Sequence, residues 1–222
     1  MDYSTPTRGR RSFLRDTLVL SSAVAGFTSL PKSLAAAGNF EGDDMNIIGP
    51  KKGYSPQIGT LVSMMTWMRA VVLMSVKGMT QADLDYLFDS KANTIGALLM
   101  HLAATETYYG LHTFQNKKWG SWDDSIKQKW DAAMNLGDAG RKAIKGNTPD
   151  FYLNLLNETR EKTLAEFRKR DDNWLMSVDQ KWGWGPTNNY CKWFHVCEHE
   201  SNHNGQIKWL KSRLPGAKQG NE

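Results

Sequence analysis

Histidine is the residue type whose spacing first suggests chemistry in this sequence. The chain of 222 residues holds only five histidines, and three of them, His195, His199 and His203, fall close together near the C-terminus. A spacing of four residues on a helix places successive side chains on nearly the same face. Neutral imidazoles suit divalent ions such as Zn²⁺, Ni²⁺ or Fe²⁺. We therefore expect His199 and His203 to be two ligands of one metal ion.

A third ligand must come from another part of the chain, and His101 is the best candidate. It stands among Leu98, Leu99 and Leu102 in a segment with helical periodicity. An imidazole without a partner would be costly in such apolar surroundings. His112 would lie about 16 Å farther along the same helix, outside the site. The alternative to a metal site is a polar helix stripe whose histidines are satisfied by ordinary hydrogen bonds.

The segment His199-Glu200-Ser201-Asn202-His203 also matches the H-E-x-x-H motif of zinc proteases, in which the glutamate acts as general base. The extended form of that motif requires Gly and His at positions 206 and 209, where this chain has Gln206 and Trp209. The only carboxylate side chain after Glu200 is that of Glu222, so a downstream glutamate ligand is nearly impossible. A zinc protease is therefore the weakest interpretation.

Other residues near the predicted metal ligands are weaker site candidates. Glu200 and Glu106 are the candidates for acid–base catalysis, although exposed helix glutamates are the simpler interpretation of both. Cys191 extends the histidine stripe by one more turn, and with His195 it is a candidate for lining the pocket. The alternative for Cys191 is a buried apolar thiol.

Helices must position these residues, because no segment shows the alternation of a β-strand. Capping residues and apolar periodicity predict four long helices, at about 56–76, 93–114, 148–170 and 188–213. A short extra helix is expected from Thr80 to Phe88, and another within the polar connection 117–146, at about 123–134. Four long helices joined by connections of unequal length indicate an all-α four-helix bundle.

The N-terminus has the order of parts found in an export signal. Arg10-Arg11 precede a mostly apolar run from Thr17 to Leu30, and Ala35–Ala37 follow with small side chains. The pattern resembles a twin-arginine (Tat) signal, which implies the Tat export machinery as a partner and a periplasmic or extracellular address after cleavage near Ala37. The expected organisation is a signal peptide at 1–37, an irregular lead-in at 38–54, a helical domain at 55–216 and a tail at 217–222. No stable membrane anchor is expected after cleavage.

Charge argues against a nucleic-acid partner. The formal net charge is +5, but the basic residues are spread along the chain, and removal of residues 1–37 would leave +2. A diffuse charge of this size is typical of a solvated surface. A small-molecule substrate is the expected partner, and the sequence leaves open whether the protein is a monomer or a homodimer.

With these motifs in view, the chain resembles the DinB-like metal-binding superfamily. The residues that carry the resemblance are Asn93–Gly96, His101–Glu106, and the run from His195 through His199 to His203-Asn204-Gly205-Gln206-Ile207. The similarity covers most of residues 55–216. It implies a four-helix bundle that holds one divalent metal ion with three histidines, at the positions of His101, His199 and His203. Some relatives use the metal to activate a low-molecular-weight thiol, as in bacillithiol transferases and maleylpyruvate isomerases.

Three histidine ligands leave a coordination position open for water or substrate, which is the arrangement of catalytic rather than structural sites. We therefore expect a metal-dependent hydrolase or transferase that acts on a small molecule. The competing hypothesis is an exported metal-binding or stress-related protein without enzymatic turnover.

Overall fold

The computed structural model describes residues 45–217, and within this range the fold is all-α, as predicted. Four long helices form the bundle: α2 (Pro56–Val76), α4 (Ile95–Gln115), α7 (Pro149–Phe167) and α9 (Asn189–Lys211). Short helices complete it: α3 (Gln81–Asp85), α5 (Asp124–Asn135), α6 (Gly137–Ala143) and α8 (Asp172–Met176). A two-stranded antiparallel ladder pairs β1 (Val178–Asp179) with β2 (Thr187–Asn188).

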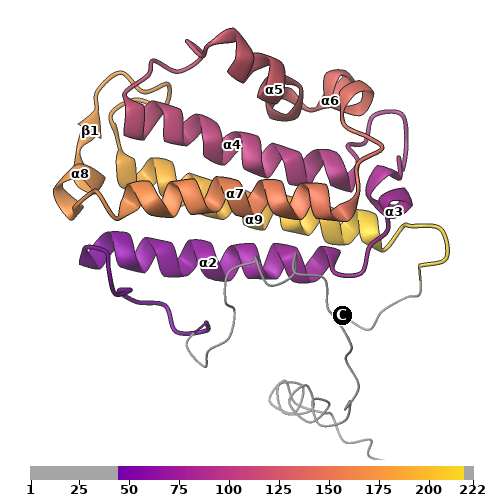
Figure 1. Ribbon diagram of the computed structural model, residues 1–222, viewed down its shortest axis with the longest axis horizontal. Helices are drawn as coiled ribbons and strands as arrows, with labels where there is room; N and C mark the ends of the chain where they lie inside the picture. The colour runs from indigo at the N-terminus through magenta and orange to yellow at the C-terminus, as the bar shows by residue number, and fades with distance from the viewer. Residues whose placement is uncertain (1–44, 218–222) are drawn as a thin grey trace, which may run out of the picture.

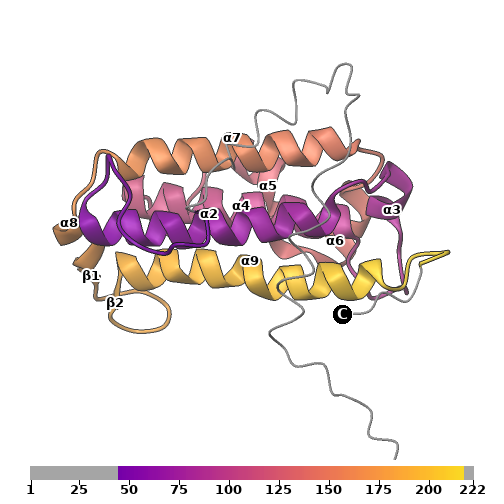
Figure 2. The same cartoon turned by 90° about the horizontal axis from the view of Figure 1, so that it is seen from below.

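The long helices lie side by side, with α2 and α9 running in one direction and α4 and α7 in the other (Figure 1). The main packing joins α2 to α9, α9 to α4, and α4 to α7, whereas α2 and α7 touch less (Figure 2). Because α4 and α7 are parallel, residues 116–148 must carry the chain back along the bundle. Helices α5 and α6 lie in this return and cover α4 (Figure 1).

Capping residues begin the long helices close to the predicted positions. Thr94 accepts a hydrogen bond from the backbone N–H of Ala97 at the start of α4, and Asn188 accepts one from Cys191 N–H at the start of α9. Pro149 occupies the first turn of α7, where its missing N–H costs nothing. These signals confirm the four predicted long helices to within a few residues.

The smaller elements differ more from the prediction. The short helix expected through Phe88 ends already at Asp85, as α3. Helices α6 and α8 and the β1–β2 ladder were not predicted. Each of these elements has two to seven residues, which is too short for apolar periodicity to develop.

The core consists of two apolar clusters along the bundle. One cluster includes Leu98, Leu102, Leu156 and Ile207, all less than 3% exposed. The other includes Ile58, Met65, Phe167 and Trp193, none of which is exposed at all. In the first cluster, the Tyr152 side chain of α7 packs closely against the backbone of α4 at Gly96. A Cβ at Gly96 would lie 2.7 Å from the Tyr152 hydroxyl oxygen. Gly96 therefore permits the packing that fixes α4.

By length and composition, α2 is the one described helix that could cross a membrane. More than half of its apolar stretch is buried inside the bundle, and it carries the buried, charged Arg69. These features are those of a core helix of a folded domain. The predicted signal peptide at 1–37 lies outside the described residues, as does most of the C-terminal tail.

Candidate metal centre

The structure brings His101, His199 and His203 together where α4 packs against α9. Nitrogen atoms of the three rings lie within 4.8 Å of one another. His199 and His203 are one turn apart on α9, and His101 faces them from the middle of α4. His101 and His203 are buried, with 6% and 8% of their surface exposed. Two helices far apart in the sequence thus supply one cluster of imidazoles.

The Nε2 atoms of the three rings converge. His199 Nε2 lies 3.3 Å from His101 Nε2 and 3.1 Å from His203 Nε2. Two nitrogen ligands at the usual Zn–N distance of about 2.0–2.1 Å are about 3.3 Å apart in a tetrahedral site. The observed separations are close to the edge of such a tetrahedron.

Backbone and side-chain acceptors fix the protonation of two of the rings. His101 Nδ1 donates to the backbone oxygen of Ala133 on α5, at 2.8 Å, and His203 Nδ1 donates to Gln206 Oε1, at 3.1 Å. A neutral imidazole with a proton on Nδ1 has a lone pair on Nε2. Both Nε2 atoms are therefore acceptors that point at the centre of the cluster.

Burial keeps the histidines neutral at physiological pH. Desolvation, together with the nearby imidazole of His203, lowers the pKa of His101 from the usual 6.5 to about 4. The same causes lower the pKa of His199 to about 3, and burial also lowers that of His203. Metal ligation requires the neutral form, so the site is already in its binding state near pH 7.

The hydrogen-bonding capacity of the cluster is incomplete without a cation. His199 can donate at most one proton from Nε2, whereas His101 and His203 both offer a lone pair. At least one buried acceptor would remain without a partner, which is unfavourable. The Nδ1 atom of His199 is also buried and has no partner among the described residues. A divalent metal ion at the centre satisfies all three Nε2 atoms, so these residues fit the metal predicted from the sequence.

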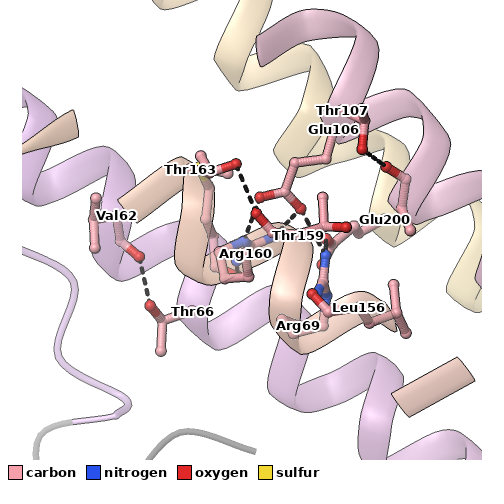
Figure 3. Close-up of polar contacts among 12 residues, drawn as sticks. Val62, Thr66, Arg69, Glu106, Thr107, Leu156, Thr159, Arg160, Thr163 and Glu200 are labelled. Carbon is pink, nitrogen blue, oxygen red and sulfur yellow. Dashed lines mark hydrogen bonds and ion pairs between the residues drawn. The ribbon is translucent and has the colours of Figure 1, made fainter. Parts of the chain in front are cut away.

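A second buried polar cluster, here called the ion layer, consists of Arg69, Glu106, Arg160 and Glu200 (Figure 3). Each long helix contributes one residue: α2, α4, α7 and α9 in that order. All four residues are at most 6% exposed. On α2, α7 and α9 the layer lies between the two apolar clusters; on α2, for example, Arg69 lies between Met65 and Val72.

Charge is balanced within the ion layer. Arg160 donates to Glu106 at 2.8 Å and to Glu200 at 2.7 Å, and Arg69 also binds both carboxylates, at 2.9 Å in the case of Glu106. One further nitrogen of each arginine donates to a backbone oxygen: Arg69 Nη1 to that of Leu156 and Arg160 Nη1 to that of Met65. Although burial works against the charged form, the two arginines lower the pKa of Glu106 below its usual value, and the two carboxylates raise that of Arg160.

Comparison with known families decides the classification. A family model for mycothiol-S-transferases matches residues 60–216, which include most of α2, the other three long helices and the three clustered histidines. The chain belongs to the mycothiol-S-transferase family. No curated protein matches the sequence. The family assignment agrees with the resemblance to the DinB-like superfamily and with a site that could bind a metal ion.

For this member of the mycothiol-S-transferase family, the structure changes the interpretation of Glu106 and Glu200. Within the described residues, neither carboxylate makes a hydrogen bond to the clustered histidines, and both are bound by Arg69 and Arg160. A carboxylate held by two guanidinium groups is stabilised in its charged form. The pair therefore has a structural role in the bundle, and the expected acid–base role receives no support.

The same contacts count against the zinc-protease interpretation of the H-E-x-x-H motif. Its mechanism needs the glutamate beside the metal, but Glu200 points from α9 into the ion layer. The partner of His199 and His203 is His101 on α4, far upstream of the motif. The motif here is a consequence of two ligands spaced by one helical turn.

The other predicted residues lie along the same helices. The ring of His195 is 5.4 Å from that of His199, and its Nδ1 lies 3.0 Å from Glu198 Oε1. Cys191 is exposed, so the alternative of a buried thiol is wrong. His112 lies in a separate polar group, where its Nε2 is 2.9 Å from Lys192 Nζ and 3.2 Å from Asp179 Oδ2.

Sequence reasoning missed three residues that matter for this architecture. Gln206, which binds His203, was noted only as part of the family pattern. Arg69 and Arg160 were not singled out, although an arginine inside the apolar run of α2 was visible in the sequence. Such an arginine signals a buried partner, because an uncompensated charge in a core is very costly.

Proposed function

We propose that the protein is a divalent-metal-dependent transferase that joins a low-molecular-weight thiol to a small electrophilic molecule. The observation that carries the proposal is the convergence of three neutral imidazole Nε2 atoms, from α4 and α9, in a chain of the mycothiol-S-transferase family. Three protein ligands leave at least one coordination position for an exogenous group. The thiol of the family name, mycothiol, is the first candidate for that group.

The residues of the chain hold and orient the centre. His101, His199 and His203 bind the metal, while the Ala133 carbonyl and Gln206 fix the rings of His101 and His203. Such hydrogen bonds keep a ligand in one tautomer and raise its basicity. When bound, the metal supplies Lewis acidity that favours the thiolate form of a coordinated thiol.

The overall reaction balances without a redox partner. The thiolate sulfur attacks an electrophilic carbon, a C–S bond forms, and the leaving group departs with the electrons of its bond. The thiol proton passes to solvent, because Glu106 and Glu200 are held in the ion layer. Hydrolysis, in which water replaces the thiol, would need a general base, and both glutamates are instead paired with Arg69 and Arg160. This favours the transferase over the hydrolase.

The test is a transfer assay with protein loaded separately with Zn²⁺, Ni²⁺ or Fe²⁺. Mycothiol is the thiol and monochlorobimane the electrophile, so that the thioether product is fluorescent and chloride is released. We expect at least one metal form to exceed the uncatalysed rate, and His203→Ala to reduce that rate to background.

His112→Ala serves as the matched control, because it removes a histidine of α4 that is not part of the cluster. Its rate should stay near that of the wild type. The proposal fails if no metal form accelerates the reaction, or if His203→Ala is as active as the wild type at equal metal loading.

A further inference from the structure

An open cavity of about 530 Å³ lies beside the metal centre, on the side of the C-terminal half of α9. Its lining includes Asn93, Leu98, Asn202, Gly205, Gln206 and Trp209. Asn202 directly precedes the ligand His203, and Gln206 accepts the hydrogen bond from His203 Nδ1. Cavities of this size are typical of small-molecule sites. The cavity is therefore adjacent to the ligand His203, although none of the three clustered histidines lines it.

Three amide side chains give the cavity its polar character. Each uses one end to bind the protein: Asn93 Oδ1 accepts from Gly137 N–H, Asn202 Nδ2 donates to Glu198, and Gln206 Oε1 accepts from His203. Within the described part of the chain, the other end of each amide makes no hydrogen bond. Two N–H donors and one carbonyl acceptor are thus left, on side chains whose orientation is already fixed.

The remaining lining is apolar and carries no ionisable side chain. Leu98 is fully buried behind this surface, whereas Trp209 is 45% exposed. The ring of Phe88 meets Trp209 edge-on at 4.9 Å, and the Arg213 guanidinium lies 3.9 Å from the indole centroid. These contacts hold the indole in place, so it offers an ordered apolar surface.

Gly205 keeps the cavity open. It lies in the interior of α9, where glycine costs about 1 kcal/mol relative to alanine. A Cβ at this position would meet no atom within 4 Å, so close packing against the protein does not require glycine here. A larger side chain at position 205 would instead occupy space in the cavity.

We propose that this cavity is a subsite for the uncharged, ring-bearing part of a small-molecule substrate. The ring lies against the exposed indole of Trp209, and hydroxyl or carbonyl oxygens of the ligand bind the free amide ends of Asn93 and Gln206. This subsite deepens the proposed function and rests on it for the identity of the ligand as a substrate. The lining itself offers no ionisable side chain to pair with a charge on this part of the substrate.

The experiment measures binding of 2-naphthol by equilibrium dialysis, in the zinc-loaded and the chelator-treated full chain. The wild type should bind 2-naphthol in both forms. Gly205→Trp should raise the dissociation constant about tenfold or more in both, which corresponds to a loss of about 1.4 kcal/mol. Gly205→Ala, the matched control, should bind like the wild type, and both variants should retain zinc.

The subsite proposal is overturned if the wild type does not bind 2-naphthol, or if Gly205→Trp binds it as tightly as the wild type does. Should Gly205→Trp fail to fold, Trp209→Ala decides: weaker binding supports the proposal, and unchanged binding overturns it. Failure of the proposed function gives a different pattern, in which 2-naphthol binding behaves as expected but thiol transfer is absent.

Discussion

Two buried polar clusters lie in the same bundle: one consists of charged side chains that bind one another, and the other of neutral imidazoles that converge on one point. In the ion layer, two arginines and two glutamates from four helices neutralise one another, and further bonds to Met65 and Leu156 satisfy the guanidinium groups. In the histidine cluster, three Nε2 atoms face a common centre without enough protons to satisfy them. In the first cluster the charges balance within the chain, whereas the second gains its missing partner when a cation binds.

The difference separates a polar group that supports the fold from one that binds a ligand. In a buried ionised network with matched charges, each charged group is stabilised by the others. A group of neutral, buried imidazoles carries no charge to balance, and it gains most when a divalent ion arrives. The same two helices carry both kinds of residue. Helix α4 contributes His101 to the histidine cluster and Glu106 to the ion layer, and α9 contributes His199 and Glu200 in the same way.

The largest effect is expected from breaking the ion layer. Arg160→Met leaves Glu106 and Glu200 with one guanidinium between them, so the free energy of unfolding should fall by about 3–5 kcal/mol. Urea denaturation of the metal-free protein measures this. Arg168→Met is the control, because Arg168 is an exposed arginine at the C-terminal end of the same helix, α7. This variant should change the free energy of unfolding by no more than about 0.5 kcal/mol. Equal stabilities of Arg160→Met and wild type would show that the layer is not structural.

Removing a metal ligand should act differently, through the metal alone. Metal at a thousandfold excess over its dissociation constant stabilises the folded state by ~4 kcal/mol. Chelation should therefore lower the melting temperature of the wild type by several degrees, and His199→Ala should abolish that difference. His112→Ala should preserve it. Identical melting curves before and after chelation, for protein shown to contain metal, would contradict the coupling of site and fold.

The sequence predicted the parts that depend on local pattern. The caps at Thr94 and Asn188 and the apolar periodicity placed α4 and α9, and the four-residue spacing placed His199 and His203 on one face. It could not predict the contacts across helices. Whether Glu200 faces the metal or Arg160 depends on how α9 packs against α7 and α2, which no local pattern records.

A smaller effect is expected from the residue that orients His203. Gln206→Ala removes the acceptor of the Nδ1 proton, and loss of such a partner costs about 10–100-fold in metal affinity. Gln206→Glu keeps an oxygen acceptor and should retain most of the affinity. Competition for Zn²⁺ with a chromophoric chelator measures both. If Gln206→Ala binds Zn²⁺ as tightly as the wild type, the hydrogen bond does not tune the site.

The two clusters should also differ in their response to pH in metal-free protein. The folded pKa values of His101 and His199, about 4 and about 3, lie below the usual 6.5, so the unfolded chain takes up protons first. Stability should therefore fall as the pH drops below 6.5, by at most about 1.4 kcal/mol per pH unit for each histidine. The pKa of Glu106 is lowered, so its contribution is present above the usual 4.5 and is lost only below it.

Between pH 6.5 and 4.5, therefore, the pH dependence of stability reports on the histidines and not on Glu106. Urea denaturation across this window should show a flatter pH dependence for the His101→Ala/His199→Ala double variant than for the wild type. Parallel curves would contradict the assignment of lowered pKa values to these histidines.

The central claim is that α4 and α9 together hold one metal ion, with His101 as the ligand that joins them. Metal analysis of wild type, His101→Ala and His203→Ala, purified identically and exposed to equal Zn²⁺, tests it directly. The account predicts about one metal ion per wild-type chain and a similar, large loss of metal in both variants. Full metal content in His101→Ala, together with loss in His203→Ala, would contradict it.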